Sequence, residues 1–187
     1  TGLNLQYDDF KQKNVSILSA KSNTIGAYIQ QTWDISEDIK LENGLRFDNV
    51  NYSNINFSKS EAFVLPKFSA LFQINDKWSS RIGGGLGYKI PTIFIEQTEA
   101  NQYQNVLALN NVKVEKSIGG TTDVNYKTNL SEDFVFSINQ MFFITQINKP
   151  LVLQNNGTNT YFINASKPIV SNGFETNVKF IFKEDLK

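Results

Sequence analysis

The segment that follows Pro91 holds the side chains best suited to contact a small molecule. Residues 92–111 read TIFIEQTEANQYQNVLALNN, and their amide and phenol side chains include Gln97, Gln102, Tyr103 and Gln104. Such groups hydrogen-bond neutral polar ligands, and a tyrosine ring can lie against a flat one. The segment contains no Arg or Lys, the residues that clamp strongly anionic ligands. It therefore favours a neutral ligand, unless basic groups come from elsewhere in the protein. The alternative is a solvated connection that touches no ligand.

The chain offers little for catalysis. It has no histidine and no cysteine, which removes the commonest general base, the commonest metal ligand and every thiol site. Glu96 and Glu99 form a carboxylate pair but have no visible partner for acid–base work. With 18 basic and 18 acidic residues the net charge is zero, so nothing supports nucleic-acid binding. We expect a non-enzymatic protein with no catalytic or metal-binding residues and no cofactor.

Long two-faced strands must position this segment. Apolar and polar residues alternate with period two from residue 25 onward, as Ile25, Ala27 and Ile29 do against the residues between them, which predicts strands. Several of these stretches exceed the 5 to 6 residues or so usual in soluble proteins and are long enough, at roughly 3.3 Å per residue, to span a bilayer when tilted. Charged residues inside them all occupy the face opposite the apolar one: Asp34, Lys40, Glu42, Arg46, Asp48, Arg81, Lys89, Asp123, Glu175 and Lys179.

This pattern predicts an antiparallel transmembrane β-barrel section. An open sheet edge in hydrocarbon leaves backbone groups unpaired, so the apolar face meets lipid and the charged face meets the lumen of a closed cylinder. The predicted lipid-facing set continues through Phe68, Ala70, Phe72 and Ile74, and through Trp78, Ile82, Leu86, Tyr88 and Ile90.

Two basic residues and three glycines are expected on the lumen face of the same region. Arg81 and Lys89 would line the lumen below the amide-rich segment, and we include both among the candidate ligand contacts. Gly83, Gly85 and Gly87 leave room there for a plug or for strand bending. The lumen of an eight-stranded barrel is normally filled by side chains, so these glycines favour a larger, occupied cylinder.

The connections alternate in length, as in outer-membrane barrels with short periplasmic turns and long extracellular loops. Short polar turns are expected at residues 36–38, 75–77, 129–133 and 183–185, and long loops at about 9–23, 50–62, 91–112 and 148–165. Aromatic residues crowd the strand ends beside the short turns and predict an interfacial girdle: Trp33, Trp78, Tyr126, Phe134 and Phe182. With a weaker first strand around Leu5, we expect about eight strands, and residues 1–187 as part of one barrel domain.

Five stretches of the sequence resemble a known family. They are GAYIQQTW at 26–33, GLRFD at 44–48, LPKFSALFQI at 65–74, RIGGGLGYKIPT at 81–92 and NGFE at 172–175. In order and spacing they are similar to the middle of the barrel of a TonB-dependent outer-membrane receptor. The resemblance implies a plugged 22-stranded cylinder, of which this chain is an internal fragment of about a third, without the plug domain and the remaining strands.

The resemblance also implies a function and partners. Members of the family are active transporters of the bacterial outer membrane that take up a scarce nutrient, such as an iron chelate, cobalamin or a sugar-like cargo, with TonB energy. The expected partners are outer-membrane lipid, the small-molecule cargo and, through the parent protein, its own plug domain and the TonB system.

Two other readings remain open from the sequence. One is a self-contained eight-stranded outer-membrane barrel of structural or adhesive role, which the family-like motifs and the three lumen-facing glycines disfavour. The other is a soluble β-sandwich or ligand-binding module with its apolar face turned inward, which the strand length disfavours.

Overall fold

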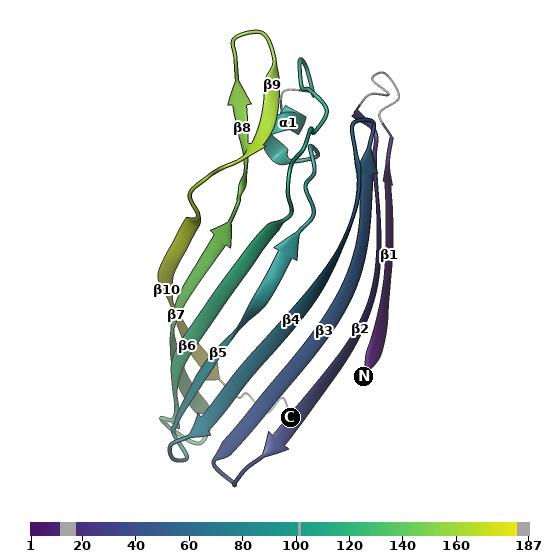
Figure 1. Cartoon of the computed structure of the whole chain (residues 1–187). Helices are drawn as coiled ribbons and strands as arrows, with labels where there is room; N and C mark the ends of the chain where they lie inside the picture. Colours follow the sequence, from purple (N-terminus) through teal and green to yellow (C-terminus); the bar gives the residue numbers. More distant parts are fainter. Residues whose placement is uncertain (12–17, 101, 183–187) are drawn as a thin grey trace, which may run out of the picture.

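The computed structural model describes residues 1–11, 18–100 and 102–182, and these residues are almost entirely β-structure. Eight strands form one antiparallel sheet in the order β1-β2-β3-β4-β5-β6-β7-β10, and β8 pairs with β9 in a separate hairpin (Figure 1). The elements are β1 Gly2–Phe10, β2 Ala20–Asp34, β3 Ile39–Asn54, β4 Ser58–Gln73, β5 Trp78–Lys89, α1 Glu96–Ala100, β6 Glu115–Asn129, β7 Phe134–Asn148, β8 Leu151–Asn155, β9 Thr160–Asn164 and β10 Ile169–Phe182. The expected eight long strands, including the weak first one, are confirmed. No helix of the described residues is long and apolar enough to cross a membrane.

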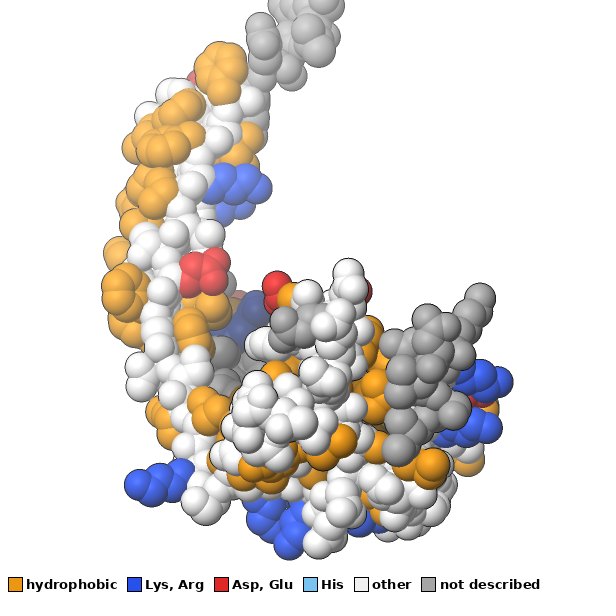
Figure 2. All heavy atoms as spheres, turned by 90° about the horizontal axis from the view of Figure 1, so that it is seen from above, with side chains coloured by type: hydrophobic (Ala, Val, Ile, Leu, Met, Phe, Trp, Pro, Cys, Tyr) orange, Lys and Arg blue, Asp and Glu red, His pale blue; other side chains and the backbone are white. Residues whose placement is uncertain are grey.

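The sheet is a curved wall that does not close. Among the described strands, β1 pairs only with β2 and β10 only with β7, so the sheet has two free edges. Seen from above, the wall forms an open arc with hydrophobic side chains along much of its convex side and charged side chains on its concave side (Figure 2). This is the shape of a section cut from a larger cylinder.

The convex face carries large apolar side chains that are exposed. Ile29 is 54% exposed, Ile82 50% and Phe174 72%, and each belongs to the predicted apolar face. A soluble sheet buries such a face against a second layer, whereas a barrel wall presents it to lipid. The sheet therefore has the two faces of a transmembrane barrel wall.

The upper part of β5 leaves the wall, and here one prediction is wrong. The ladder between β4 and β5 ends at the pair Lys67 and Gly85, while β5 stays paired with β6 as far as Lys89. Above that point Tyr88 stacks on Phe63 of the concave face, with ring centroids 4.1 Å apart. Because the end of β5 is freed from β4, Tyr88 turns inward instead of facing lipid.

The same inward turn moves Ile90, the next residue of the predicted lipid-facing set. Ile90 and Tyr88 pack against a buried cluster on the concave side made of Val50, Tyr52, Phe63, Leu65 and Val114. The upper concave wall of β3 and β4 thus carries an apolar cluster, while the glycines Gly83, Gly85 and Gly87 lie lower on the concave wall.

The short turns lie where they were expected. Ile35 N donates to Ile39 O (2.9 Å), Ile74 N to Trp78 O (2.9 Å) and Leu130 N to Phe134 O (2.8 Å). Three of the five aromatic residues predicted beside these turns contact neighbouring rings: Trp78 and Tyr126 lie 4.7 Å apart between centroids, and Phe134 lies 5.8 Å from Phe180. The turn predicted at 183–185 lies outside the described residues.

The long connections differ from expectation in two places. Residues 50–62 are mostly strand, because β3 runs to Asn54 and β4 begins at Ser58. Asn54 Oδ1 closes this tight turn by accepting from the backbone N of Asn56 (2.8 Å) and Phe57 (3.0 Å). The connection at 148–165 contains the hairpin β8–β9, which was not predicted. Of the connection at 9–23, residues 12–17 lie outside the described part.

The two faces make a quantitative prediction for folding into lipid. Ile29→Arg or Phe72→Arg places a charge on the convex face and is expected to lower the free energy of unfolding by about 2 to 4 kcal/mol near the bilayer midplane. Ser69→Arg and Ser137→Arg on the concave face are the matched controls and should cost much less. A denaturant titration of the protein folded in vesicles measures both sets, and equal penalties would contradict the assignment of the faces.

Candidate functional site

The long connections at the end of the sheet opposite the short turns fold together into one unit, which we call the head: residues 91–112 and the hairpin β8–β9 (Figure 1). Leu107 N donates to Thr160 O and Thr160 N donates to Asn105 O, both at 2.8 Å. The head has its own hydrophobic core, formed by Ile93, Val106, Leu109, Val112 and Phe162, to which Leu18 of the β1–β2 connection adds. Two segments that are distant in sequence therefore share one core.

Polar side chains anchor the head to the wall. Asn54 and Asn56, at the β3–β4 turn, each donate from Nδ2 to Leu109 O at 2.9 Å. Lys59 Nζ donates to Val112 O at 2.7 Å. These bonds satisfy carbonyls of an irregular segment and hold the head on the concave side of β3 and β4.

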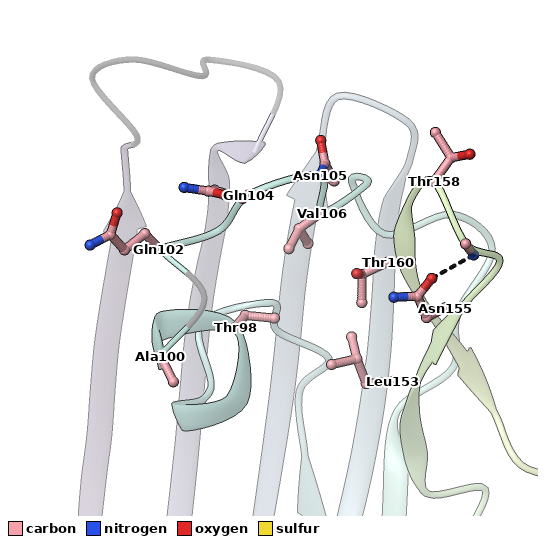
Figure 3. A pocket seen from close by; sticks show the side chains of 11 residues that line it. Thr98, Ala100, Gln102, Gln104, Asn105, Val106, Leu153, Asn155, Thr158 and Thr160 are labelled. Carbon is pink, nitrogen blue, oxygen red and sulfur yellow. Dashed lines mark hydrogen bonds between the residues drawn. The ribbon is translucent and has the colours of Figure 1, made fainter.

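A pocket of about 470 Å³ lies between α1, the turn at residues 102–105 and the hairpin. In Figure 3, Thr98, Val106 and Leu153 lie around its middle, and Gln102 and Gln104 project from its rim on the side away from the hairpin. None of the described lining residues is charged; they are Thr98, Ala100, Gln102, Gln104, Asn105, Val106, Leu153, Asn155, Gly157, Thr158 and Thr160. We call this the head pocket.

The structure brings together two of the four residues singled out in the amide-rich segment. Gln102 and Gln104 line the head pocket. Tyr103 packs against the head core, with its ring edge-on to Phe94 at 5.7 Å. Gln97 is exposed on α1 and does not line the pocket. Backbone geometry explains the split, because Gln102 and Tyr103 have φ of 52° and 56°, and this left-handed turn sends neighbouring side chains in different directions.

The two basic candidates lie lower, in two separate places. Arg81 borders a broad hollow of about 990 Å³ on the concave wall, together with Gly83, Gly85 and Gly87. Lys89 borders a pocket of about 390 Å³ beneath the head, and its Nζ is 4.0 Å from Glu115 Oε2. Both line the lumen side of the wall, and neither lines the head pocket.

Three of the family-like stretches meet at a buried carboxylate. Asp48 is fully buried, and its Oδ2 lies 2.8 Å from Arg46 Nη2 and accepts from the Tyr88 hydroxyl at 2.8 Å. A Cβ at Gly26 would collide with Asp48 Oδ1, so only glycine fits opposite it. The alternating charges of β3, including Arg46 and Asp48, were visible in the sequence, but the approach of Gly26 from β2 and of Tyr88 from β5 depends on the strand register and the tertiary structure.

Sequence reasoning missed the hairpin half of the pocket. Asn155, Gly157, Thr158 and Thr160 line it, and they lie in a run of small polar residues at 155–160 that is typical of a turn. Composition alone does not distinguish a turn residue from a binding residue. The signal that was available is the absence of any charged residue from 151 to 164.

Comparison with known proteins decides the family. A family model described as TonB dependent receptor-like, beta-barrel, matches residues 2–183. The chain belongs to the TonB-dependent receptor β-barrel family. The resemblance seen in the sequence is thus confirmed, and so is the fold expected from it. A search of curated proteins finds no match.

Solved structures share the fold of this TonB-dependent receptor barrel. The FrpB iron transporter from Neisseria meningitidis is 21% identical, with a TM-score of 0.65 over 86% of this chain and 24% of its own. The Serratia marcescens hemophore receptor HasR is 11% identical, with a TM-score of 0.76 over 93% of this chain and 35% of its own. The ferric-catecholate import receptor Fiu from E. coli K12 is 15% identical, with a TM-score of 0.60 over 86% and 26%. The chain thus spans between a quarter and about a third of these proteins.

The buried carboxylate of this receptor barrel section predicts a stability effect. Tyr88→Phe keeps the ring stacked on Phe63 but removes the hydrogen bond to Asp48, which should lower the free energy of unfolding by about 1 to 3 kcal/mol. Tyr28→Phe is the matched control, because the Tyr28 ring is 44% exposed and its hydroxyl has no hydrogen bond to the described residues. Urea unfolding in vesicles compares the two, and an equal loss for both would contradict the role of the Asp48 contact.

Proposed function

We propose that this chain is a section of the barrel of an active transporter in the bacterial outer membrane, which imports a scarce small nutrient with energy from the TonB system. The observation that carries the proposal is the curved wall with an exposed apolar convex face in a chain of this receptor family. Similar solved structures include an iron transporter, a ferric-catecholate import receptor and a copper transporter. This range supports scarce iron or another metal-linked nutrient as cargo, while cobalamin or a sugar-like molecule enters the proposal from the sequence resemblance alone.

The free edges of the sheet support a larger cylinder. Each edge strand presents a row of backbone groups that would be costly to leave unpaired in lipid. In the proposed receptor, further strands of the same barrel pair with β1 and β10, and the plug domain occupies the concave side. The broad hollow beside Gly83, Gly85 and Gly87 gives such a plug room to approach the wall.

Two features weigh against the other readings. A self-contained eight-stranded barrel needs β1 and β10 to pair, and within the described residues they do not. A soluble sandwich needs a second layer over the apolar face, and large residues such as Phe174 remain exposed there.

In the proposed receptor the cargo first meets the head. Gln102 and Gln104 contact it at the head pocket, with Gln97 and Tyr103 beside them in the same segment. Arg81 and Lys89 then line its route down the lumen side of the wall. The chain needs no catalytic group for this role, because transport works through binding and gating.

Topology can be tested on intact cells. Gln102→Cys in the head should react with a membrane-impermeant thiol reagent, and Asp76→Cys in a short turn should not, because long and short connections lie on opposite sides of the membrane. The chain has no native cysteine that would interfere. Labelling at position 76 without labelling at position 102 would reverse the orientation.

Uptake tests the function itself. Gln104→Ala in the receptor that contains this chain should weaken cargo uptake roughly tenfold, because a polar partner of the cargo is left unpaired. The measurement is uptake of radiolabelled cargo, with receptor abundance followed by immunoblotting of outer membranes.

Thr32→Ala, near the short-turn end of β2, is the matched control and should leave uptake unchanged. Deleting the gene for TonB should abolish uptake by the unaltered receptor. Uptake that persists without TonB would refute active transport, and uptake that survives deletion of residues 97–106 would refute a cargo role for the segment.

A further inference from the structure

We propose that the head pocket takes a neutral ligand rich in hydroxyl or amide groups, and that Asn155 of the β8–β9 hairpin is an oriented hydrogen-bond donor to it. The proposal rests on the transport function above and deepens it, because it names the chemical class of the cargo and a specificity residue outside the amide-rich segment.

The first argument is the chemistry of the pocket lining. Amide side chains come from Gln102, Gln104, Asn105 and Asn155, and hydroxyls come from Thr158 and Thr160, whereas the Thr98 hydroxyl is already bonded to Ile95 O at 2.8 Å. Each amide carries both donors and acceptors, and each hydroxyl does the same. Such a lining matches a ligand whose own groups both donate and accept, as sugar hydroxyls and amides do. A multiply charged anion would lose its hydration here without a cation to replace it.

The second argument is where the chain keeps its charges. It has 18 basic residues, yet neither of the two segments that form the head pocket, 92–111 and 151–164, contains a single Lys or Arg. The charges that 92–111 does contain, Glu96 and Glu99, are acidic and would repel an anion. Basic residues such as Arg46 and Lys89 border the deeper pocket beneath the head instead. The pocket beneath the head therefore has cations in its lining that the described lining of the head pocket lacks.

The third argument is the fixed orientation of Asn155. Its Oδ1 accepts from the backbone N of Gly157 at 2.6 Å, the bond drawn in Figure 3. This bond sets which end of the amide is oxygen and which is nitrogen. Nδ2 is then left on the side of the other pocket residues and has no hydrogen bond to the described residues. A donor held in place before the ligand arrives binds it with little loss of side-chain freedom.

Backbone strain beside the pocket points the same way. Gln102, Tyr103 and Asn105 have φ of 52°, 56° and 55°, a left-handed conformation that L-residues with side chains adopt at a cost. The head core, which includes Val106 and against which Tyr103 packs, holds the segment in this shape. Strained conformations held by packing are common at binding sites. The volume of about 470 Å³ also falls in the range of roughly 300 to 1,000 Å³ of small-molecule sites.

The proposal is tested with the purified full-length receptor by isothermal titration calorimetry. A neutral tetrasaccharide and a neutral ferric trihydroxamate represent the two sources of the neutral chemistry, and ferric dicitrate and a ferric tricatecholate represent anionic chelates. We expect one of the neutral probes to bind, and neither anionic probe to bind at the head pocket. Which neutral probe binds distinguishes a carbohydrate from a neutral chelate as the cargo.

The key variant is Asn155→Asp. It retains an oxygen to accept from Gly157, so the hairpin keeps its internal bond, but it replaces the donating Nδ2 by an acceptor. Affinity for the neutral probe should fall about tenfold. Gln154→Leu is the matched control on the same hairpin. Gln154 is exposed, does not line the pocket and accepts only from Tyr161 at 3.3 Å among the described residues, so its loss should change affinity less than about twofold.

Gln104→Arg is an independent test of whether the ligand is neutral or anionic. A cation at the rim should weaken binding of a neutral probe or leave it unchanged, and it should tighten binding of an anion. Failure of both neutral probes to bind, binding of an anionic probe to the unaltered receptor that Gln104→Arg then tightens, or neutral binding that Asn155→Asp leaves unchanged would each overturn the proposal. Uptake without TonB would refute the transport function but leave the ligand class standing, so the two failures can be told apart.

Discussion

Lateral pairing of backbone groups is the constraint from which the rest of this structure follows. Hydrocarbon offers no partner for an N–H or C=O, so each strand in lipid must pair with a neighbour on both sides. Strands β2 to β7 do so, for example over the whole of β2 against β3 from Ala20 to Asp34. Once pairing fixes the backbone, side chains alternate between lipid and lumen, and only the lipid face must be apolar. The lumen face is then free to carry charges, glycines or a buried carboxylate.

The structure departs from this regular pattern where the constraint weakens. The β4–β5 ladder ends at Lys67 and Gly85, and above it β5 turns inward until Tyr88 reaches Asp48 and Phe63. A side-chain hydrogen bond and a ring stack thus replace the missing backbone ladder. Higher still, water can satisfy backbone groups, so the connections can be long and irregular. Only there can a head with its own core and pocket form.

These limits explain what the sequence could predict. Period two predicted the faces of the sheet because each position alternates between two different environments as long as the ladder continues. The same rule predicted the wrong face for Tyr88, because it assumes that a strand is paired on both sides. At Tyr88 the ladder with β4 has already ended, although the ladder with β6 continues. Residues 50–62 read as a loop because outward positions such as Asn51 are polar above the apolar band, although β3 continues to Asn54. The strands β8 and β9, each five residues long, face no lipid and so leave no apolar alternation.

The candidate site was predictable in its chemistry but not in its geometry. Composition identified an amide-rich segment without cations, and charge is a property that survives any folding of the segment. Which side chains share a pocket depends on the left-handed turn at Gln102 and Tyr103 and on the backbone bonds that bring Asn105 to Thr160, and neither follows from local pattern. The hairpin segment 151–164 also lacks cations. Folding therefore brings together two segments without cations, and neither supplies a positive charge to the pocket. The electrostatic character of the pocket is therefore set by sequence, while the tertiary structure decides which of the amides line it.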